Sequence, residues 1–239
     1  MSSALIYCMM RLPKVVPSIS FPRFSPRSFD SRIALAHKLA VESAKEDFAK
    51  RPNDHLIGRF EVRVVDKKGK VLGIGKSPVA DLFTNNFGNI LGSIFAWPGT
   101  GGVPILSLKD ITNAAVTAYS WYANYSWFGN GSYAVGLQLG VGSNATAPAR
   151  TDYNMGTLLG AWTNVTNSTD LYSASTFQII TTCSITLASG GSVVEAGAAF
   201  VLYNSIGGTK TVMIAHDAIS PTVVVPAGAA AIPSWTVQT

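Results

Sequence analysis

From residue 81 onward the chain carries almost no charge, and this limits the surfaces it can build. In this charge-poor region (81–239) the only basic residues are Lys109, Arg150 and Lys210, whereas the whole chain has 18 Lys and Arg. A soluble domain usually contains about a quarter charged residues. The region must therefore cover its surface with Ser, Thr, Asn, Tyr and Gly, which is typical of subunits packed among copies of themselves or of proteins outside cells. Its acids are Asp81, Asp110, Asp152, Asp170, Glu195 and Asp217.

Residues 1–28 are basic, contain no acid and include four prolines. Prolines at this density prevent a helix or a central strand, so we expect an extended arm that a neighbour orders. Positive charge suits an acidic partner subunit or a weak contact with nucleic acid. The residues expected to dock the arm are Arg11, Lys14, Arg23 and Arg27.

The N-terminus does not resemble a signal for export. Its apolar run, 5–10, comes before Arg11 and Lys14, whereas a secretory signal places the charge first. We therefore expect an unprocessed chain. No uncharged apolar run reaches the length of a membrane span, so none is expected.

A second unit is expected over 29–76. Apolar residues at helical spacing predict a helix over 30–51, whose stripe is Ile33, Ala36, Ala40, Ala44 and Phe48. The pairs Lys38–Glu42 and Glu46–Lys50 have the i,i+4 spacing of helix ion pairs. A β-hairpin follows over 57–74, and Gly69 supplies its turn.

The third unit, 77–239, is expected to begin with an apolar helix over 77–96, capped by Ser77 with Pro78 in its first turn. Short strand-like runs separated by Gly, Asn and Ser then continue to the end. Gly190-Gly191 and Gly207-Gly208 are expected to form hairpin turns. Many short strands without helices between them favour an antiparallel β-sandwich of jelly-roll type. The expected strands lie near 103–108, 114–122, 132–141, 157–163, 173–187, 193–204, 210–216, 221–225 and 232–238.

No motif for catalysis, a cofactor or a metal passes inspection, so an enzyme is not expected. The run 73–77 resembles the end of a phosphate-binding loop, but the first glycine of that motif would fall at Lys70. The glycine-rich run 140–145 is followed by Pro148 and has no strand–helix–strand context. The carboxylates of Asp110 and Asp152, near an aromatic-rich segment, leave glycosidase chemistry open as an alternative.

Sequons for N-glycosylation cluster between 124 and 167, which favours one exposed, glycosylated face. A stretch rich in Asn, Ser and Thr also produces such triplets by chance. The candidate glycosylation sites are Asn124, Asn130, Asn144, Asn164 and Asn167.

Aromatic residues crowd into 119–133. Such a cluster builds a platform for sugars or bases, or a seam between subunits, and the low charge of the surroundings favours the seam. The candidate interface aromatics are Trp121, Tyr122, Tyr125, Trp127 and Phe128.

Three segments together carry a family resemblance. The run 140–155, Gly-Val-Gly-Ser-Asn-Ala-Thr-Ala-Pro-Ala-Arg-Thr-Asp-Tyr-Asn-Met, resembles a segment of virion structural proteins from tailed phages and some archaeal viruses. The runs 194–197 and 213–228 are similar to later strands of those proteins, and the helix around 82–91 also fits. Physically, Gly140 and Gly142 are expected to allow a tight turn after a strand, and Asp152 to cap a turn at 153–154. The resemblance implies no catalytic residues.

These observations predict a structural component of a virus particle, in its shell, turret or tail. It would be made in the host cytoplasm and would assemble with copies of itself and with other virion proteins. Two alternatives remain open: an exported cell-surface or filament subunit, and a carbohydrate-binding adhesin that uses the aromatic cluster.

Overall fold

The structure is a computed structural model that describes residues 31–48, 57–66, 68–79, 83–95, 108–116, 136–144, 147–172, 177–204 and 208–238. The basic arm, the aromatic cluster and the sequons at Asn124 and Asn130 lie outside these residues. The protein is mainly β, as predicted, and its strands pair antiparallel. In chain order, the elements are α1 (Ser31–Phe48), β1 (Ile57–Val65), β2 (Val71–Lys76), α2 (Asn85–Phe95), β3 (Leu108–Lys109), β4 (Ala115–Val116), β5 (Gly136–Gly142), β6 (Leu158–Asn164), β7 (Asn167–Tyr172), β8 (Phe177–Thr182), β9 (Ile185–Leu187), β10 (Gly191–Asn204), β11 (Gly208–Val225) and β12 (Ala229–Gln238).

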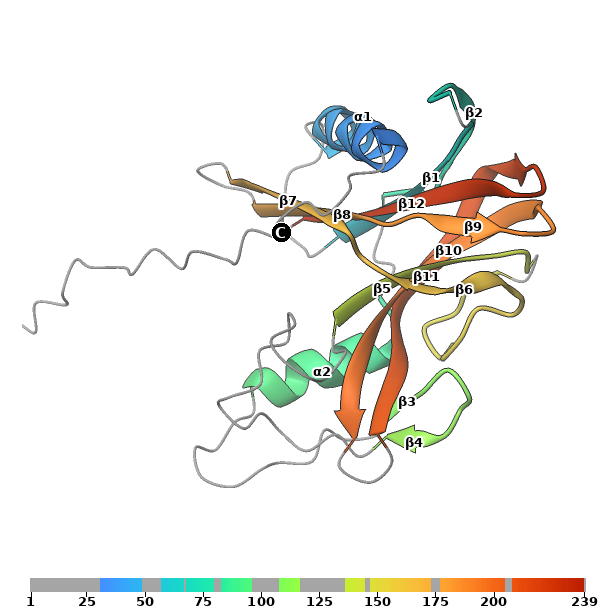
Figure 1. Ribbon diagram of the computed structural model, residues 1–239. Helices are drawn as coiled ribbons and strands as arrows, with labels where there is room; N and C mark the ends of the chain where they lie inside the picture. The colour runs from blue at the N-terminus through green and yellow to red at the C-terminus, as the bar shows by residue number, and fades with distance from the viewer. Residues whose placement is uncertain are drawn as a thin grey trace, which may run out of the picture.

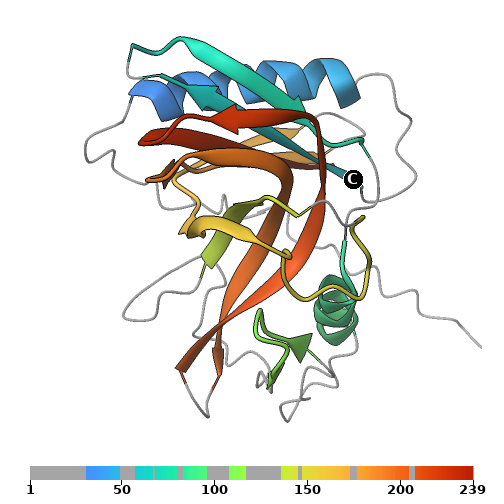
Figure 2. The same cartoon turned by 90° about the vertical axis from the view of Figure 1, so that its right-hand side faces the viewer.

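One sheet forms most of the molecule, in the order β6-β5-β10-β11-β2-β1-β12-β8-β7, with β9 also paired to β12. The sheet curls strongly, so its two halves face each other (Figures 1 and 2). Since β1 pairs with β12 and β2 with β11, residues 57–76 and the charge-poor region form one continuous sheet. The small hairpin of β3 and β4 is separate from this sheet.

The core fills the inside of the curl. Phe60 and Val62 of β1 belong to the same buried cluster as Leu139 of β5 and Ile214 of β11. Trp235 of β12 stacks on Phe60, with ring centroids 6.0 Å apart. Burying side chains of this size contributes about 1.5–3 kcal/mol each, so the two halves of the sheet hold each other closed.

Helix α1 covers the outer side of the sheet, above β12 and β8 (Figure 1). Ala36, Ala40 and Ala44 are buried, as the predicted stripe requires, and their small side chains let the helix approach Ile180. The ring nitrogens of His37 lie 2.8 Å from the hydroxyl oxygens of Thr182 and Thr169, which fixes the helix across β8 and β7.

The ion pairs expected on α1 are only partly described. Glu42 pairs with Lys45, three residues away and 3.1 Å distant, instead of with Lys38. The other expected pair, Glu46–Lys50, lies outside the side chains that the structure describes. The β1–β2 hairpin is confirmed, and Gly69 has the positive φ, 84°, that its turn needs.

The second helix begins later than predicted. Residues 77–79 and 83–84 are not helical, and the hydroxyl of Ser77 accepts a hydrogen bond from the amide of Phe60 at 2.9 Å. Phe83 instead forms a β-bridge with Ala215, and the amide of Thr84 donates to the carbonyl of Ile214. At Phe83 and Thr84, pairing with β11 therefore replaces the expected helix, and α2 starts at Asn85.

Several strand predictions need correction. β7 was not predicted, and the expected run 173–187 is divided into β8 and β9. The runs 210–216 and 221–225 are parts of the single long strand β11. The turn at Gly190-Gly191 does not close a hairpin, because β9 pairs with β12 and not with β10. β10 and β11 are paired as far as Asn204 and Gly208, and the residues between these two lie outside the described part of the chain.

The glycines of the 140–155 segment do not form a turn. Gly140 and Gly142 lie inside β5, and neither has a positive φ. These glycines are needed because there is no room for a side chain at either position. A Cβ on Gly140 would lie 2.7 Å from Met155, and one on Gly142 would lie 2.4 Å from Glu195. The loop over 147–157 can therefore lie directly on the outer side of the sheet, where Met155 is buried.

Candidate functional site

The sheet register brings together three ionisable side chains that are far apart in sequence. Gly197 of β10 pairs with His216 of β11, and Glu195 pairs with Ala218. Glu195 and His216 are thus diagonal neighbours on one side of the sheet. Both are almost fully buried, with 2% and 5% of their surface exposed. Asp152 approaches them from the loop that covers this side.

The loop is closed by Asp152. Its Oδ2 accepts a hydrogen bond from the amide of Ala149 at 2.7 Å, and its own amide donates to the carbonyl of Ala149 at 3.0 Å. Asp152 was expected to cap a turn at 153–154. Its carboxylate caps the preceding turn, which begins at Ala149, instead. The reason is that His216 lies on the same side and attracts the carboxylate, with Nε2 at 3.1 Å from Oδ2.

His216 lies between two carboxylates. Its Nδ1 is 3.9 Å from Oε2 of Glu195, and its Nε2 also approaches the carbonyl of Ala149 at 3.4 Å. Burial by itself lowers the pKa of His216, but the nearby carboxylates of Glu195 and Asp152 and the carbonyl of Ala149 outweigh it, so the pKa is raised. When it is protonated, the imidazolium of His216 joins Asp152 of the 147–157 loop to β10 and β11.

A cavity of about 370 Å³ opens beside this cluster. Three buried polar atoms of residues that line it have no hydrogen-bond partner: Oε1 of Glu195, Nδ1 of His216 and Oδ1 of Asn154. Buried polar atoms normally have partners, so the cavity suits water or a small polar ligand. The lining residues are Ile111, Thr112, Asn144, Ala147, Asp152, Tyr153, Asn154, Met155, Gly156, Glu195 and His216.

The chemistry that this cluster can perform is limited. Within the described parts of the chain, no group of three or more His, Cys, Asp or Glu side chains could hold a metal ion.

Asp110, the other carboxylate of the glycosidase alternative, accepts hydrogen bonds from Thr112 and Ala114 and lies 3.5 Å from Lys210. Those bonds and the charge of Lys210 lower the pKa of Asp110 although burial acts in the opposite direction. Asp110 therefore stays charged at the β3–β4 turn. The general acid of a glycosidase must be protonated, so Asp110 does not suit that role.

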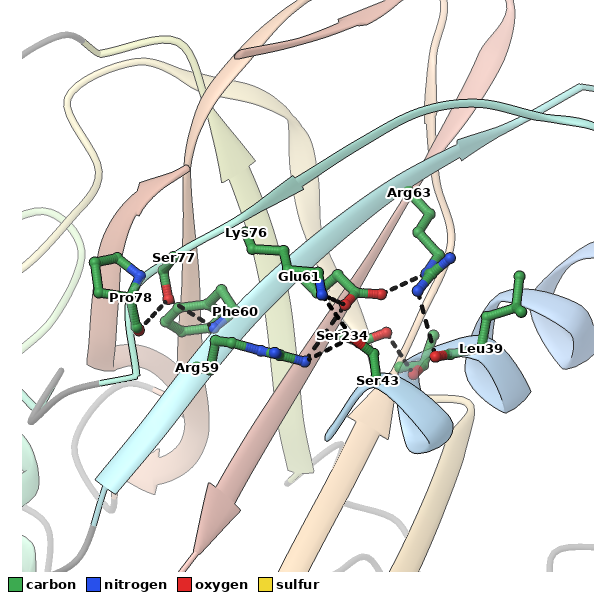
Figure 3. A network of polar contacts seen from close by, with 11 residues as sticks. Leu39, Ser43, Arg59, Phe60, Glu61, Arg63, Lys76, Ser77, Pro78 and Ser234 are labelled. Atoms are coloured by element: carbon green, nitrogen blue, oxygen red, sulfur yellow. Dashed lines mark hydrogen bonds and ion pairs between the residues drawn. The ribbon is translucent and has the colours of Figure 1, made fainter. Parts of the chain in front are cut away.

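A second buried charge cluster also lies on the outer side of the sheet, under α1 (Figure 3). Glu61 of β1 pairs with the guanidinium of Arg63, with Nη2 of Arg59 at 3.4 Å and with Nζ of Lys76 at 3.6 Å. Arg59 and Glu61 are 3% and 2% exposed. Burial lowers the pKa of Arg59; the charge of Glu61 raises it and that of Arg63 lowers it further.

This Glu61 cluster also holds the helix. Nζ of Lys76 donates to the hydroxyl of Ser43 at 2.7 Å, and Nη2 of Arg63 donates to the carbonyl of Leu39 at 3.3 Å (Figure 3). Part of the positive charge of the first 80 residues is thus internal. Arg59 and Arg63 are structural and cannot form a surface for nucleic acid.

The described sequons lie on β5, β6 and β7. Asn164 is exposed at the end of β6, where its Oδ1 accepts from Nε2 of Gln138 at 2.9 Å, and half-buried Asn167 begins β7. Gln138 pairs with Asn164 near the start of β5, and Gly142 pairs with Leu158 at the end of β5. Asn144 comes just after that end, so it lies at the opposite end of the β5–β6 pair from Asn164. The structure brings Asn164 and Asn167 together and places Asn144 about six strand residues, or about 20 Å, away.

Sequence reasoning missed both clusters. It noted Asp152, and it noted the run 213–228 that contains His216, but only the pairing of β10 with β11 places Glu195 beside His216. A scan of the chain against protein-family models, a search of curated proteins and a search of solved structures each found no match. Among the residues that the structure places, no helix is long and apolar enough to cross a membrane.

Proposed function

We propose that this protein is a structural component of a virus particle, built on a jelly-roll-like β-sandwich body with an N-terminal docking arm. The observation that carries the proposal is the meeting of the three segments that resemble virion proteins. Gly140 pairs with Gly197, and Gly197 pairs with His216. Segments separated by tens of residues in sequence thus form three adjacent strands, β5, β10 and β11.

The residues that these segments contribute have packing tasks. Gly140 and Gly197 leave room for Met155 of the 147–157 loop and for Trp162 of β6: a Cβ on Gly197 would lie 3.1 Å from Trp162 and 3.2 Å from Met155. Gly142 leaves room for Glu195. Asp152 and His216 then fix that loop. The proposal assigns this buried cluster to holding the subunit in one shape, which a repeating assembly requires.

The arm has a defined starting point. α1 begins at Ser31 and is fixed to the sheet by the Glu61 cluster and by His37. Residues 1–28, with their four basic side chains, would leave this anchored helix and dock on a neighbouring copy, on another virion protein or, weakly, on the viral genome. Arms of this kind bury a wide surface when they become ordered.

The test compares the full chain with a chain lacking residues 1–28. α1 is kept, because its removal would uncover the buried charges of β1. By electron microscopy and light scattering, we expect closed rings, shells or tubes from the full chain and small oligomers from the truncated chain. If both chains are monodisperse monomers over the concentration range of the experiment, self-assembly is wrong.

A further inference from the structure

Large apolar side chains that are exposed gather at one place. Within the described ranges there are four: Leu35 of α1 is 37% exposed, Leu72 and Ile74 of β2 are 48% and 37%, and Val224 of β11 is 67%. We call these four residues the aliphatic patch. Single exposed apolar residues are ordinary, but a contiguous group marks a contact surface.

The sheet register shows that the patch is contiguous. Lys76 of β2 pairs with Ser220 of β11. A Cβ on Gly73 would lie 3.2 Å from the side chain of Val223, so β11 also lies against β2 at this position. Leu72 and Val224 are the sequence neighbours of these two residues and are both exposed. Leu35 joins them from the helix, since its Cδ2 lies 3.9 Å from the Cβ position of Gly69 in the β1–β2 turn.

The outward orientation of the patch is built into β2. Gly73 and Gly75 face the core, where a Cβ on Gly75 would lie 2.4 Å from Ile219. These glycines let β2 lie close to β11. Leu72 and Ile74 alternate with them and therefore point away from the core. The strand thus presents its large side chains outward and its small ones inward, the reverse of an ordinary surface strand.

Lysines surround the patch. Lys68 and Lys70 are exposed in the turn that precedes Leu72. Lys38 is exposed on α1, one turn after Leu35. The acid of the turn, Asp66, accepts hydrogen bonds from the amides of Lys68 and Lys70, both at 2.8 Å. The exposed acid of α1 near this edge, Glu42, pairs with Lys45.

We propose that the aliphatic patch and its lysines bind an anionic membrane surface. The centres of protein interfaces are enriched in aromatic residues and Arg and depleted in Lys, whereas this patch is aliphatic and surrounded by Lys. Aliphatic side chains that enter the boundary between headgroups and acyl chains, with Lys reaching the lipid phosphates, are typical of peripheral membrane binding. The inference does not depend on the proposed function, since it concerns one face of a single subunit.

The test measures co-sedimentation of the full chain with phosphatidylcholine vesicles, with or without about 30% phosphatidylserine. We expect binding to the anionic vesicles and little to the neutral ones. The double variants Leu72→Gln/Val224→Gln and Lys68→Gln/Lys70→Gln should each weaken binding about tenfold or more. The matched control Lys109→Gln/Arg150→Gln removes the same charge from exposed residues of the charge-poor region and should bind as the wild type does.

The arm and self-association need separate controls. A chain with Arg11, Lys14, Arg23 and Arg27 all replaced by Gln should keep binding to anionic vesicles. The proposal is overturned if the wild type does not bind, if only the arm variant loses binding, or if both patch variants bind normally. It is also overturned if Leu72→Gln/Val224→Gln changes the oligomeric state and leaves vesicle binding intact, because the patch would then join copies of the chain.

Discussion

Two clusters of buried charge fasten a covering element to the outer side of the same curled sheet, and they are built differently. Under α1, one acid, Glu61, is shared by Arg59, Arg63 and Lys76. Under the 147–157 loop, one imidazole, His216, is shared by two acids, Asp152 and Glu195. The first cluster joins a long helix to the sheet; the second joins an irregular loop.

The difference lies in how completely the buried glutamate of each cluster is partnered. Both oxygens of Glu61 have cationic partners, and Ser43 and Leu39 of the helix complete the cluster. In the second cluster, Oε1 of Glu195 and Nδ1 of His216 are buried without hydrogen-bond partners, and a cavity lies beside them. We therefore expect the Glu61 cluster to be a fixed joint, and the His216 cluster to respond to pH.

The largest effect is expected from Glu61→Gln. It leaves Arg59 and Arg63 buried without their carboxylate, which should lower the free energy of unfolding by about 3–5 kcal/mol. Urea unfolding measures it. The control is Glu42→Gln, which breaks the exposed pair with Lys45 and should cost less than about 0.5 kcal/mol. Equal effects of the two variants would show that the buried cluster does not stabilise the fold.

Gly142→Ala tests whether Glu195 is held in place. The new Cβ would lie 2.4 Å from Oε1 of Glu195, and a clash of this kind should cost about 1–3 kcal/mol. Gly136→Ala is the matched control in the same strand, because nothing lies within 4 Å of its Cβ position. If both variants unfold at the same urea concentration, Glu195 is free to move and the second cluster is looser than described.

The pH dependence of stability should separate the clusters. Because the folded pKa of His216 is raised above 6.5, the charged imidazole contributes stability that is fully present below pH 6.5 and is lost as pH rises through the folded value. The stability difference between the wild type and His216→Gln should shrink from about pH 5.5 to about pH 8.5. The deficit of Glu61→Gln should stay constant over this range, since that cluster contains no histidine. A constant difference for His216→Gln would contradict the assignment.

The smallest change in stability is expected from Asp152→Asn. The amide retains an oxygen that can accept from Ala149, and Asp152 is 37% exposed, so the loss should be no more than about 1 kcal/mol. The clearer readout is the pKa of His216, followed by nuclear magnetic resonance. It should fall, because the charge of Asp152 is one of the causes that raise it. An unchanged pKa would leave Glu195 and Ala149 as its determinants.

Local patterns predicted the elements that depend on near neighbours. The alanine stripe predicted α1, and the run of alternating residues around Gly69 predicted the β1–β2 hairpin. The helix expected from Ser77 was wrong at Phe83 and Thr84, because both pair with β11, a partner more than 100 residues away. Apolar spacing cannot distinguish these outcomes, since a short apolar run is compatible with a helix or a strand.

The candidate site could be predicted only in part. In Arg59-Phe60-Glu61-Val62-Arg63 the charges alternate with core residues, and this period of two was a usable signal that one side of β1 carries a charge cluster. For His216 no such signal existed. Its partners come from a loop and from another strand, and a shift of one residue in strand pairing would turn either side chain away.

The pairing of β1 with β12 has a consequence for how the protein is made. Ile57 pairs with Gln238 and Val65 with Ala230, so β1 cannot pair along this edge until β12 has been synthesised. Contacts this distant in sequence form slowly, and until they form the apolar side of β1 is open to aggregation. A nascent chain therefore cannot close the curled sheet while β12 is still inside the ribosome.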